Sequence, residues 1–161
     1  MFGSDQTSGY DLSSYYILGG SALTTVPSTK ITMLGGKVKC IFGGSNALGP
    51  YDASSGDTSV IICGVVITED VYGGGFGVSE NSVIGNTSVT VSGRTITLYV
   101  LGGGYDGSVS RTACLKVYEN ASVSRSISDG SIGGGNVGVN SFAECEVAFY
   151  NDTTKLKNPT P

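Results

Sequence analysis

Short runs along this chain alternate between apolar and polar residues with the period of two that is typical of β-strands. Residues 88–91 read SVTV and residues 95–98 read TITL, so every second residue is apolar. Such alternation predicts strands that bury one side. The longest apolar run, VIICGVVI at 60–67, is far too short to cross a bilayer. The pattern therefore predicts an all-β chain without membrane insertion.

Glycine clusters, each preceded by an apolar pair, recur at a nearly constant interval. The clusters begin at Gly43, Gly73, Gly102 and Gly133. A repeat of about 29–31 residues holds three strands of about five residues each and three corners. This favours a parallel β-solenoid of about five coils, each pairing with the next about 4.8 Å away. Because periodicity does not fix strand direction, an antiparallel β-sandwich or β-prism is the alternative.

The segments between the clusters also correspond to one another. SVIICGVVITEDVYGGG at 59–75 and SVTVSGRTITLYVLGGG at 88–104 each contain a run, a Cys-Gly or Ser-Gly corner, and a second run before the glycines. In this alignment Thr90 corresponds to Ile61 and Lys116, so the threonines do not form the continuous array of an ice-binding surface. The period is blurred toward the N-terminus. We therefore predict an N-terminal cap or degenerate repeat at 1–38, glycine-rich repeats at 39–152, and a tail or linker at 153–161.

Glycine at the same phase of every repeat has a structural explanation. It supplies positive φ at corners and lets the backbones of stacked coils approach closely. A phosphate-binding loop is a poorer explanation, because no Gly-Lys-Ser/Thr motif and no helical pattern follow VYGGGFG at 71–77.

Composition and charge narrow the possible functions. The 161 residues include 13 acidic and 9 basic side chains, for a net charge of −4, and the basic residues are spread out, which argues against nucleic-acid binding. Without a histidine, neither a Ser-His-Asp nor a Cys-His arrangement is possible. The four cysteines lack metal-ligand spacing, so we expect no zinc. Disulfides and free core thiols both remain open for Cys40, Cys63, Cys114 and Cys145.

Paired carboxylates are the remaining route to catalysis, as in glycoside hydrolases. Glu144 and Glu146 would lie on one face of a strand. The alternative is that these acids are scattered over an otherwise neutral surface and keep it soluble. We therefore expect no catalytic residue, no metal and no cofactor. A carbohydrate-active enzyme is the alternative. Its other candidate acids are Glu69, Asp70, Glu80, Asp106, Glu119 and Asp129.

Aromatic residues next to the glycine clusters are candidates for binding. Phe76 and Tyr105 each directly follow a glycine run, so they share a phase and would stack as a ladder along one edge. An exposed ladder of this kind would suit a sugar; the alternative is that the rings cover the corners. The candidate ligand-binding residues are Tyr72, Phe76, Tyr105, Asp106 and Asn136.

The segment VYGGGFGVSENSVIGNTSVTVSG at 71–93 resembles the glycine-rich repeats of bacterial adhesin-like surface proteins, and LGGGYDGSVSRTACLKVYEN at 101–120 resembles their first half. Phage fibres carry similar repeats. The resemblance covers residues 39–150 and implies extracellular or cell-surface display, attachment, and no enzymatic activity, with a virion fibre or capsid-associated protein as the alternative. We expect a non-catalytic structural or adhesive module whose partners are copies of itself, in a homo-oligomer or filament, or a surface glycan.

Overall fold

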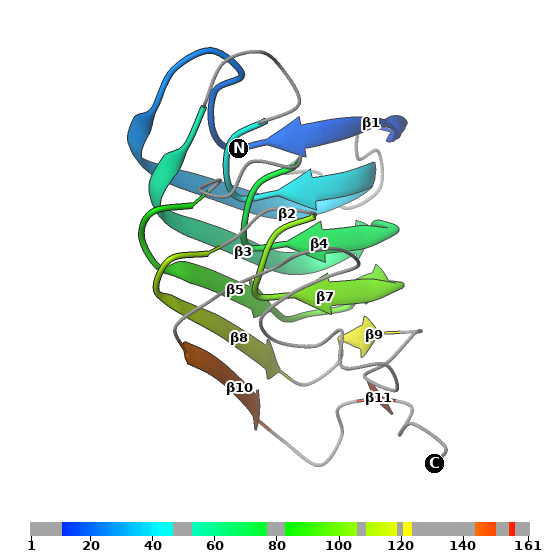
Figure 1. The fold of residues 1–161 in the computed structure, drawn as a ribbon. Coiled ribbons are helices and arrows are strands. Elements are labelled where there is room, and N and C mark those ends of the chain that lie inside the picture. Colours follow the sequence, from blue (N-terminus) through cyan, green and yellow to red (C-terminus); the bar gives the residue numbers. More distant parts are fainter. Residues whose placement is uncertain are drawn as a thin grey trace.

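The computed structural model describes residues 11–46, 53–76, 83–105, 109–118, 121–123, 144–150 and 155–156. These residues wind into a parallel β-solenoid of about three turns, which confirms the predicted fold (Figure 1). Every pairing between the described strands is parallel, so the antiparallel alternative is wrong for them. The strands are β1 (Asp11–Leu18), β2 (Val26–Phe42), β3 (Ser55–Ile67), β4 (Asp70–Tyr72), β5 (Thr87–Val91), β6 (Ile96–Thr97), β7 (Tyr99–Leu101), β8 (Thr112–Tyr118), β9 (Ser122–Val123), β10 (Glu144–Tyr150) and β11 (Lys155–Leu156).

The strands form three rows that run along the column (Figure 1). The first row consists of the N-terminal part of β2 followed by β3, β5, β8 and β10. The second row consists of residues 35–37 within β2, the end of β3, and then β6, β9 and β11. The third row consists of β1, the C-terminal part of β2, β4 and β7. Three strands per repeat, as the repeat length predicts, are therefore observed.

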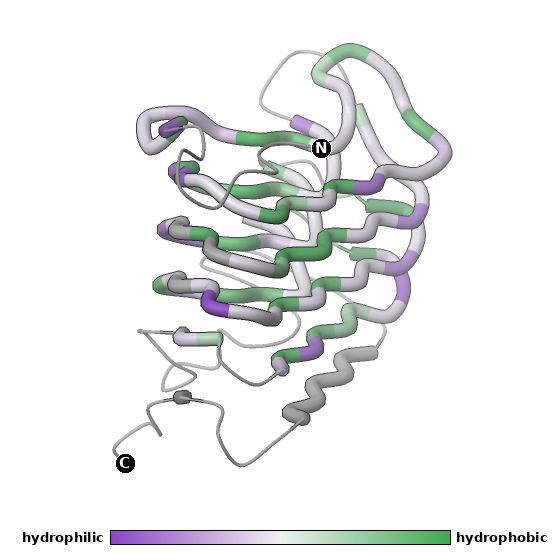
Figure 2. Tube along the Cα trace, turned by 180° about the vertical axis from the view of Figure 1, so that it is seen from behind, coloured by the Kyte–Doolittle hydropathy of each residue, from purple (hydrophilic) through white to green (hydrophobic). Residues whose placement is uncertain are grey.

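Aliphatic side chains at the same phase of successive coils stack in columns inside the solenoid. Figure 2 shows hydrophobic segments recurring at matching places along the stacked coils. Fully burying one such side chain stabilises the fold by about 1.5–3 kcal/mol, so these columns are its main support. The buried register partners are Ile31, Val60, Val89 and Leu115 in one column, Met33, Ile62, Val91 and Val117 in a second, and Ile41, Val71 and Val100 in the third row.

The corners between the first and second rows need glycine for its backbone conformation. Gly36, Gly64 and Gly93 have φ angles of 101°, 102° and 70°, which L-residues with a side chain rarely adopt. Gly64 and Gly93 are the corner glycines that the aligned repeats predict.

The glycine clusters need glycine for a different reason, which is close packing between coils. A Cβ atom on Gly73 would meet the carbonyl oxygen of Gly102 in the next coil and would lie 2.9 Å from Cγ2 of Val89. A Cβ atom on Gly74 would lie 2.7 Å from the nitrogen of Gly104. The clusters therefore recur because each one stacks directly on the next.

In three successive coils a buried threonine reaches the glycine turn of its own coil. Thr58 Oγ1 donates a hydrogen bond to the carbonyl oxygen of Gly73, at 2.6 Å. A buried carbonyl needs such a donor, because an unpaired one is costly. We call these bonds the turn ties; the other two join Thr29 to Gly43 and Thr87 to Gly102.

The first coil joins the stack although its glycines do not keep the period. The step from Gly19 to Gly43 is shorter than those between the later clusters, yet Leu18 pairs with Phe42 and the Gly19 amide donates to the Phe42 carbonyl at 2.9 Å. The register of β1 shifts between Leu12 and Tyr16, because β1 has two more residues there than β2; we call this irregularity the bulge. The LGG at 18–20 is thus part of the glycine stack, whereas the LGG at 34–36 forms a corner.

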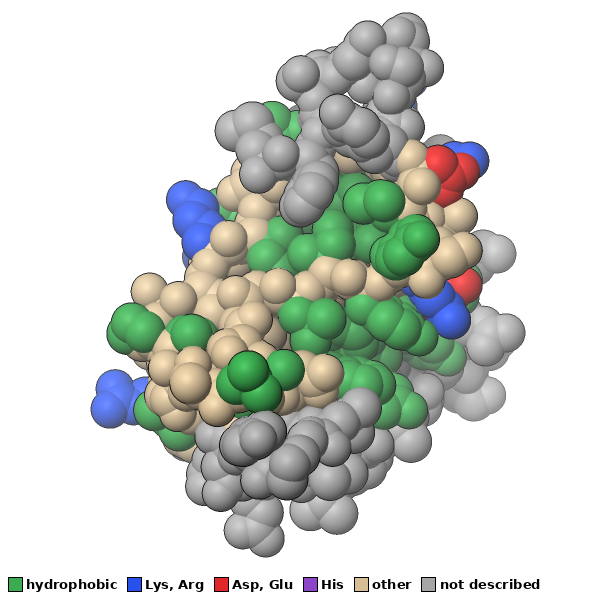
Figure 3. All heavy atoms as spheres, turned by 90° about the horizontal axis from the view of Figure 1, so that it is seen from above, with side chains coloured by type: hydrophobic (Ala, Val, Ile, Leu, Met, Phe, Trp, Pro, Cys, Tyr) green, Lys and Arg blue, Asp and Glu red, His purple; other side chains and the backbone are tan. Residues whose placement is uncertain are grey.

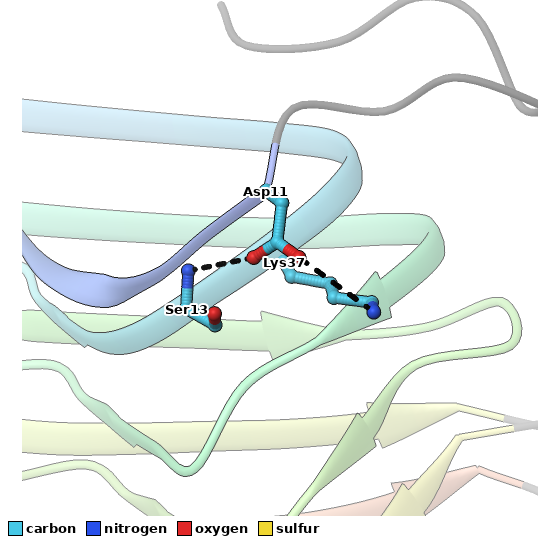
Figure 4. Close-up of polar contacts among 3 residues, drawn as sticks. All are labelled: Asp11, Ser13 and Lys37. Atoms are coloured by element: carbon cyan, nitrogen blue, oxygen red, sulfur yellow. Dashed lines mark hydrogen bonds and ion pairs between the residues drawn. The ribbon is translucent and has the colours of Figure 1, made fainter.

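An exposed ion pair lies at this end of the column (Figure 4). Asp11 accepts a hydrogen bond from the Ser13 amide at 3.1 Å, and Lys37 Nζ lies 3.8 Å from its other oxygen. Hydrogen bonds from Ser13 hold the pKa of Asp11 below its usual value, with a smaller contribution from Lys37. Seen from this end, hydrophobic side chains occupy much of the middle of the molecule and charged ones lie toward its periphery (Figure 3).

Candidate functional site

The outer face of the third row is apolar, where a sheet facing water would carry polar side chains. Neighbouring residues of a strand point to opposite faces, so Phe42 and Tyr72 lie outside, opposite the interior residues Ile41 and Val71. Phe42 is nevertheless only 2% exposed and Tyr72 only 5%. We define the aromatic strip as the five rings on this face that contact one another: Tyr16, Phe42, Tyr72, Phe76 and Tyr105.

The strip has two layers. In the inner layer Phe42 and Tyr72, which are register partners, stack with their centroids 4.8 Å apart and an interplanar angle of 3°. That distance equals the usual spacing of paired strands, so the rings stack as their backbones do. In the outer layer Phe76 stacks on Tyr105 at 5.2 Å and 28°, and Tyr16 lies 6.2 Å from Phe76 at 20°. The layers are joined by tilted and edge contacts of Phe42 with Phe76 and of Tyr72 with Tyr105.

The glycine clusters position the outer layer. Phe76 and Tyr105 pair in parallel directly after their clusters, so the two rings share a phase and stack, as the sequence predicts. The Tyr105 amide donates to the Gly75 carbonyl at 2.9 Å, which fixes this register. Asn46 holds the equivalent place one coil above and has no ring, and Tyr16 from β1 packs against Phe76 instead.

Stacking covers both faces of Phe76, and one face each of Tyr16 and Tyr105. Tyr16 is 49% exposed and Tyr105 37%, while Phe76 is half-buried. The faces of these rings are turned toward one another along the column. A sugar that stacks on an aromatic side chain needs a free face, and Phe76, with a ring stacked on each side, offers none.

Polar groups border the strip. Lys39 Nζ lies 5.3 Å from the centroid of the Tyr16 ring, a cation–π distance. The Tyr72 hydroxyl donates to Asp70 Oδ2 at 3.2 Å. Burial, and next the Asp70 carboxylate, raise the pKa of Tyr72 above its usual value, so it stays a neutral donor. Burial likewise raises the pKa of the Cys40 thiol to about 11, with Asp70 adding to the effect.

The structure brings together three of the predicted site residues. Tyr72, Phe76 and Tyr105 all belong to the strip, and their role in binding stays a prediction. Asp106 and Asn136 lie outside the described residues. The sequence analysis missed Phe42 and Tyr16. Phe42 precedes its glycine cluster as Tyr72 does, so a signal existed; Tyr16 follows a bulge and carried none.

The candidate acids do not form a cluster where they are described. Glu69 is exposed, and Asp70 beside it accepts the bond from Tyr72. Glu144 and Glu146 lie in β10, in register with Thr112 and Cys114 of β8. Across the described ranges, no group of three or more His, Cys, Asp or Glu residues is placed to hold a metal ion. Glu80, Asp106, Glu119 and Asp129 lie outside those ranges.

One unpredicted acid has a structural role. Asp57 Oδ1 accepts hydrogen bonds from the Asn86 amide at 2.8 Å and from Asn86 Nδ2 at 3.1 Å, and Asn86 Oδ1 accepts one from the Thr112 amide at 3.3 Å. These bonds link three successive coils. Cys40 and Cys63 are free thiols.

None of the described segments is a helix long and apolar enough to cross a membrane. No family model matches the chain, and neither a curated protein nor a solved structure matches it. A proposal for its function therefore rests on the chain's own residues.

Proposed function

We propose that this chain is a non-catalytic structural or adhesive module, displayed outside the cell or on its surface, that assembles with copies of itself. The observation that carries the proposal is the aromatic strip. A contiguous apolar patch on the outside of a β-column marks a contact surface, because water-facing positions are otherwise polar. The same module on a virion would be a fibre or capsid-associated protein.

Two partners fit such a surface, and the geometry favours one of them. A surface glycan would need free ring faces, which Phe76 and Tyr105 use on each other at 5.2 Å. A second copy would bury the exposed parts of Tyr16 and Tyr105 without displacing that stack. Self-association is therefore the leading form of the proposal, and glycan attachment is the second.

Mass and shape in solution test the proposal directly. Light scattering and small-angle X-ray scattering on one dilution series of the full chain should show a dimer, trimer or filament that grows with concentration. Tyr105→Gln should weaken the assembly, and Ile84→Gln, at a side chain that is 47% exposed and outside the strip, should not. A protein that stays monomeric at every concentration would contradict self-association.

A glycan array on the same samples separates the two partners. Binding that Tyr105→Gln abolishes and Ile84→Gln preserves would make the module a sugar-binding adhesin. A wild-type chain that remains monomeric and binds no glycan would contradict both forms of the proposal.

A further inference from the structure

The corner between the second and third rows presents one outward residue from each of four successive coils. Glu69 lies directly below Lys39, because its amide donates to the Lys39 carbonyl at 2.8 Å. Leu98 lies below Glu69 in the same way, with its amide 2.6 Å from the Glu69 carbonyl. Tyr15 of β1 lies above Lys39, because the residues that follow these two are register partners. We call these four residues, Tyr15, Lys39, Glu69 and Leu98, the corner column.

The side chains of the corner column are accessible to a partner. Tyr15 is 65% exposed and Leu98 37%, so the column has an apolar side chain in water at each end. Between them, Glu69 is exposed and Lys39 is half-buried. Because paired strands are about 4.8 Å apart, the four positions are evenly spaced along the solenoid.

The order of these side chains is self-complementary. From the N-terminal end it reads tyrosine, lysine, glutamate, leucine, which is apolar, positive, negative, apolar. Reversing the direction of the column exchanges Lys39 with Glu69 and Tyr15 with Leu98. A second copy with the opposite direction would therefore set opposite charges against each other in the middle and apolar side chains against each other at both ends. A two-fold interface needs such an order, because the same patch has to fit itself.

The aromatic strip follows the same symmetry. Its most exposed rings are Tyr16 and Tyr105, which belong to the first and fourth coils, as Tyr15 and Leu98 do. A two-fold axis along the strand direction, midway between the second and third coils, would place the first coil of one copy opposite the fourth coil of the other. Lys39 joins the two surfaces, since its Nζ lies 5.3 Å from the centroid of the Tyr16 ring.

We propose that two copies pair through the corner column and the adjoining aromatic strip, with their long axes antiparallel and Lys39 of each copy opposite Glu69 of the other. This inference rests on the proposed self-association and adds its arrangement. Each lysine then faces a carboxylate across the interface and has another below it in its own chain. Two copies with parallel axes would instead set Lys39 against Lys39, and like charges placed together disfavour such a pair.

Charge reversal in the full chain, followed by light scattering over a dilution series, tests the pairing. Lys39→Glu and Glu69→Lys should each raise the dissociation constant of the pair by about tenfold or more, because like charges then meet at two symmetry-related places. The double variant keeps the wild-type net charge and restores the alternation, so its constant should return to within about threefold of the wild type.

Cross-linking tests the orientation separately. Tyr15→Cys and Leu98→Cys variants, mixed and treated with a short bismaleimide, should give a link between the two introduced cysteines, which peptide mass mapping identifies. Each variant alone should give no link between its own introduced cysteines. Links of that second kind, in place of the mixed one, would show parallel axes and overturn the proposal.

The matched control is Arg94→Glu, which makes the same charge change as Lys39→Glu at an exposed residue of another corner and should leave the constant unchanged. A wild-type chain that assembles, but is weakened as much by the double variant as by the single ones, would overturn the antiparallel arrangement alone. A wild-type chain that stays monomeric at every concentration would overturn the proposed self-association and this arrangement with it.

Discussion

Two apolar clusters lie on opposite sides of the third row, and they are built differently. The interior cluster repeats coil by coil with aliphatic side chains such as Ile41, Val71 and Val100, which are at most 1% exposed. The aromatic strip collects its rings from separate parts of the chain, and two of them, Tyr16 and Tyr105, remain partly exposed. The first cluster therefore holds the fold, whereas the second ends at a surface that a partner can reach.

Introducing an aspartate should have the largest effect, and its effect on folding should differ most between the two clusters. Ile62→Asp places a charge in an interior column that is fully buried, which should cost more than about 5 kcal/mol and prevent folding. Tyr105→Asp should fold, because that position meets water. Circular dichroism and urea titration of both variants check this, and a folded Ile62→Asp would contradict the account of the interior.

Within the strip, truncating a ring of the inner layer should cost more unfolding free energy than truncating a ring of the outer layer. Phe42→Ala removes a buried ring and should cost about 3–5 kcal/mol of unfolding free energy. Tyr105→Ala should cost about 1 kcal/mol in the monomer, because its ring is already partly hydrated. Urea titration at low protein concentration measures both. Equal losses would mean that the two layers are not distinct.

Loss of one hydroxyl should have a smaller effect. Tyr72→Phe removes the hydrogen bond to Asp70 and should cost about 1 kcal/mol. The control is Tyr15→Phe, at a side chain that is 65% exposed, which should change the unfolding free energy by less than about 0.5 kcal/mol. A Tyr72→Phe variant as stable as the wild type would show that this bond contributes nothing net.

The smallest perturbation is chemical labelling of the Cys40 thiol. Because its pKa is raised to about 11, each pH unit below that value reduces the reactive thiolate by about tenfold. Alkylation of Cys40 at pH 8 should therefore be much slower than that of the partly exposed Cys63, and it should accelerate as pH rises. Peptide mass mapping after timed alkylation measures the rates. Labelling of Cys40 as fast as Cys63 would contradict its burial.

Much of the interior cluster could be predicted from the sequence, because it depends only on alternation and period. The alignment that places Thr90 opposite Ile61 and Lys116 is the register that the structure has. The corner glycines Gly64 and Gly93 were predicted for the reason that the structure shows. Structural features that recur with the repeat period can therefore be predicted from the sequence.

The rest of the strip depends on contacts that break the period. Tyr16 reaches Phe76 across two coils after a bulge, and neither the bulge nor the shortened first interval is encoded in the alternation. The threonine ties were also missed, because a threonine at an inward position of an alternating run reads like any other strand residue. Only the neighbouring Gly73 carbonyl shows what Thr58 does there.

The stacking of one glycine cluster on the next constrains how the molecule can change in length. A side chain added at Gly73 would intrude on Gly102 below it, so single substitutions in the stack disturb two coils at once. Duplicating or deleting one whole repeat, by contrast, restores the same neighbours above and below. The gene can therefore lengthen or shorten this column in steps of one repeat more easily than it can alter a repeat from within.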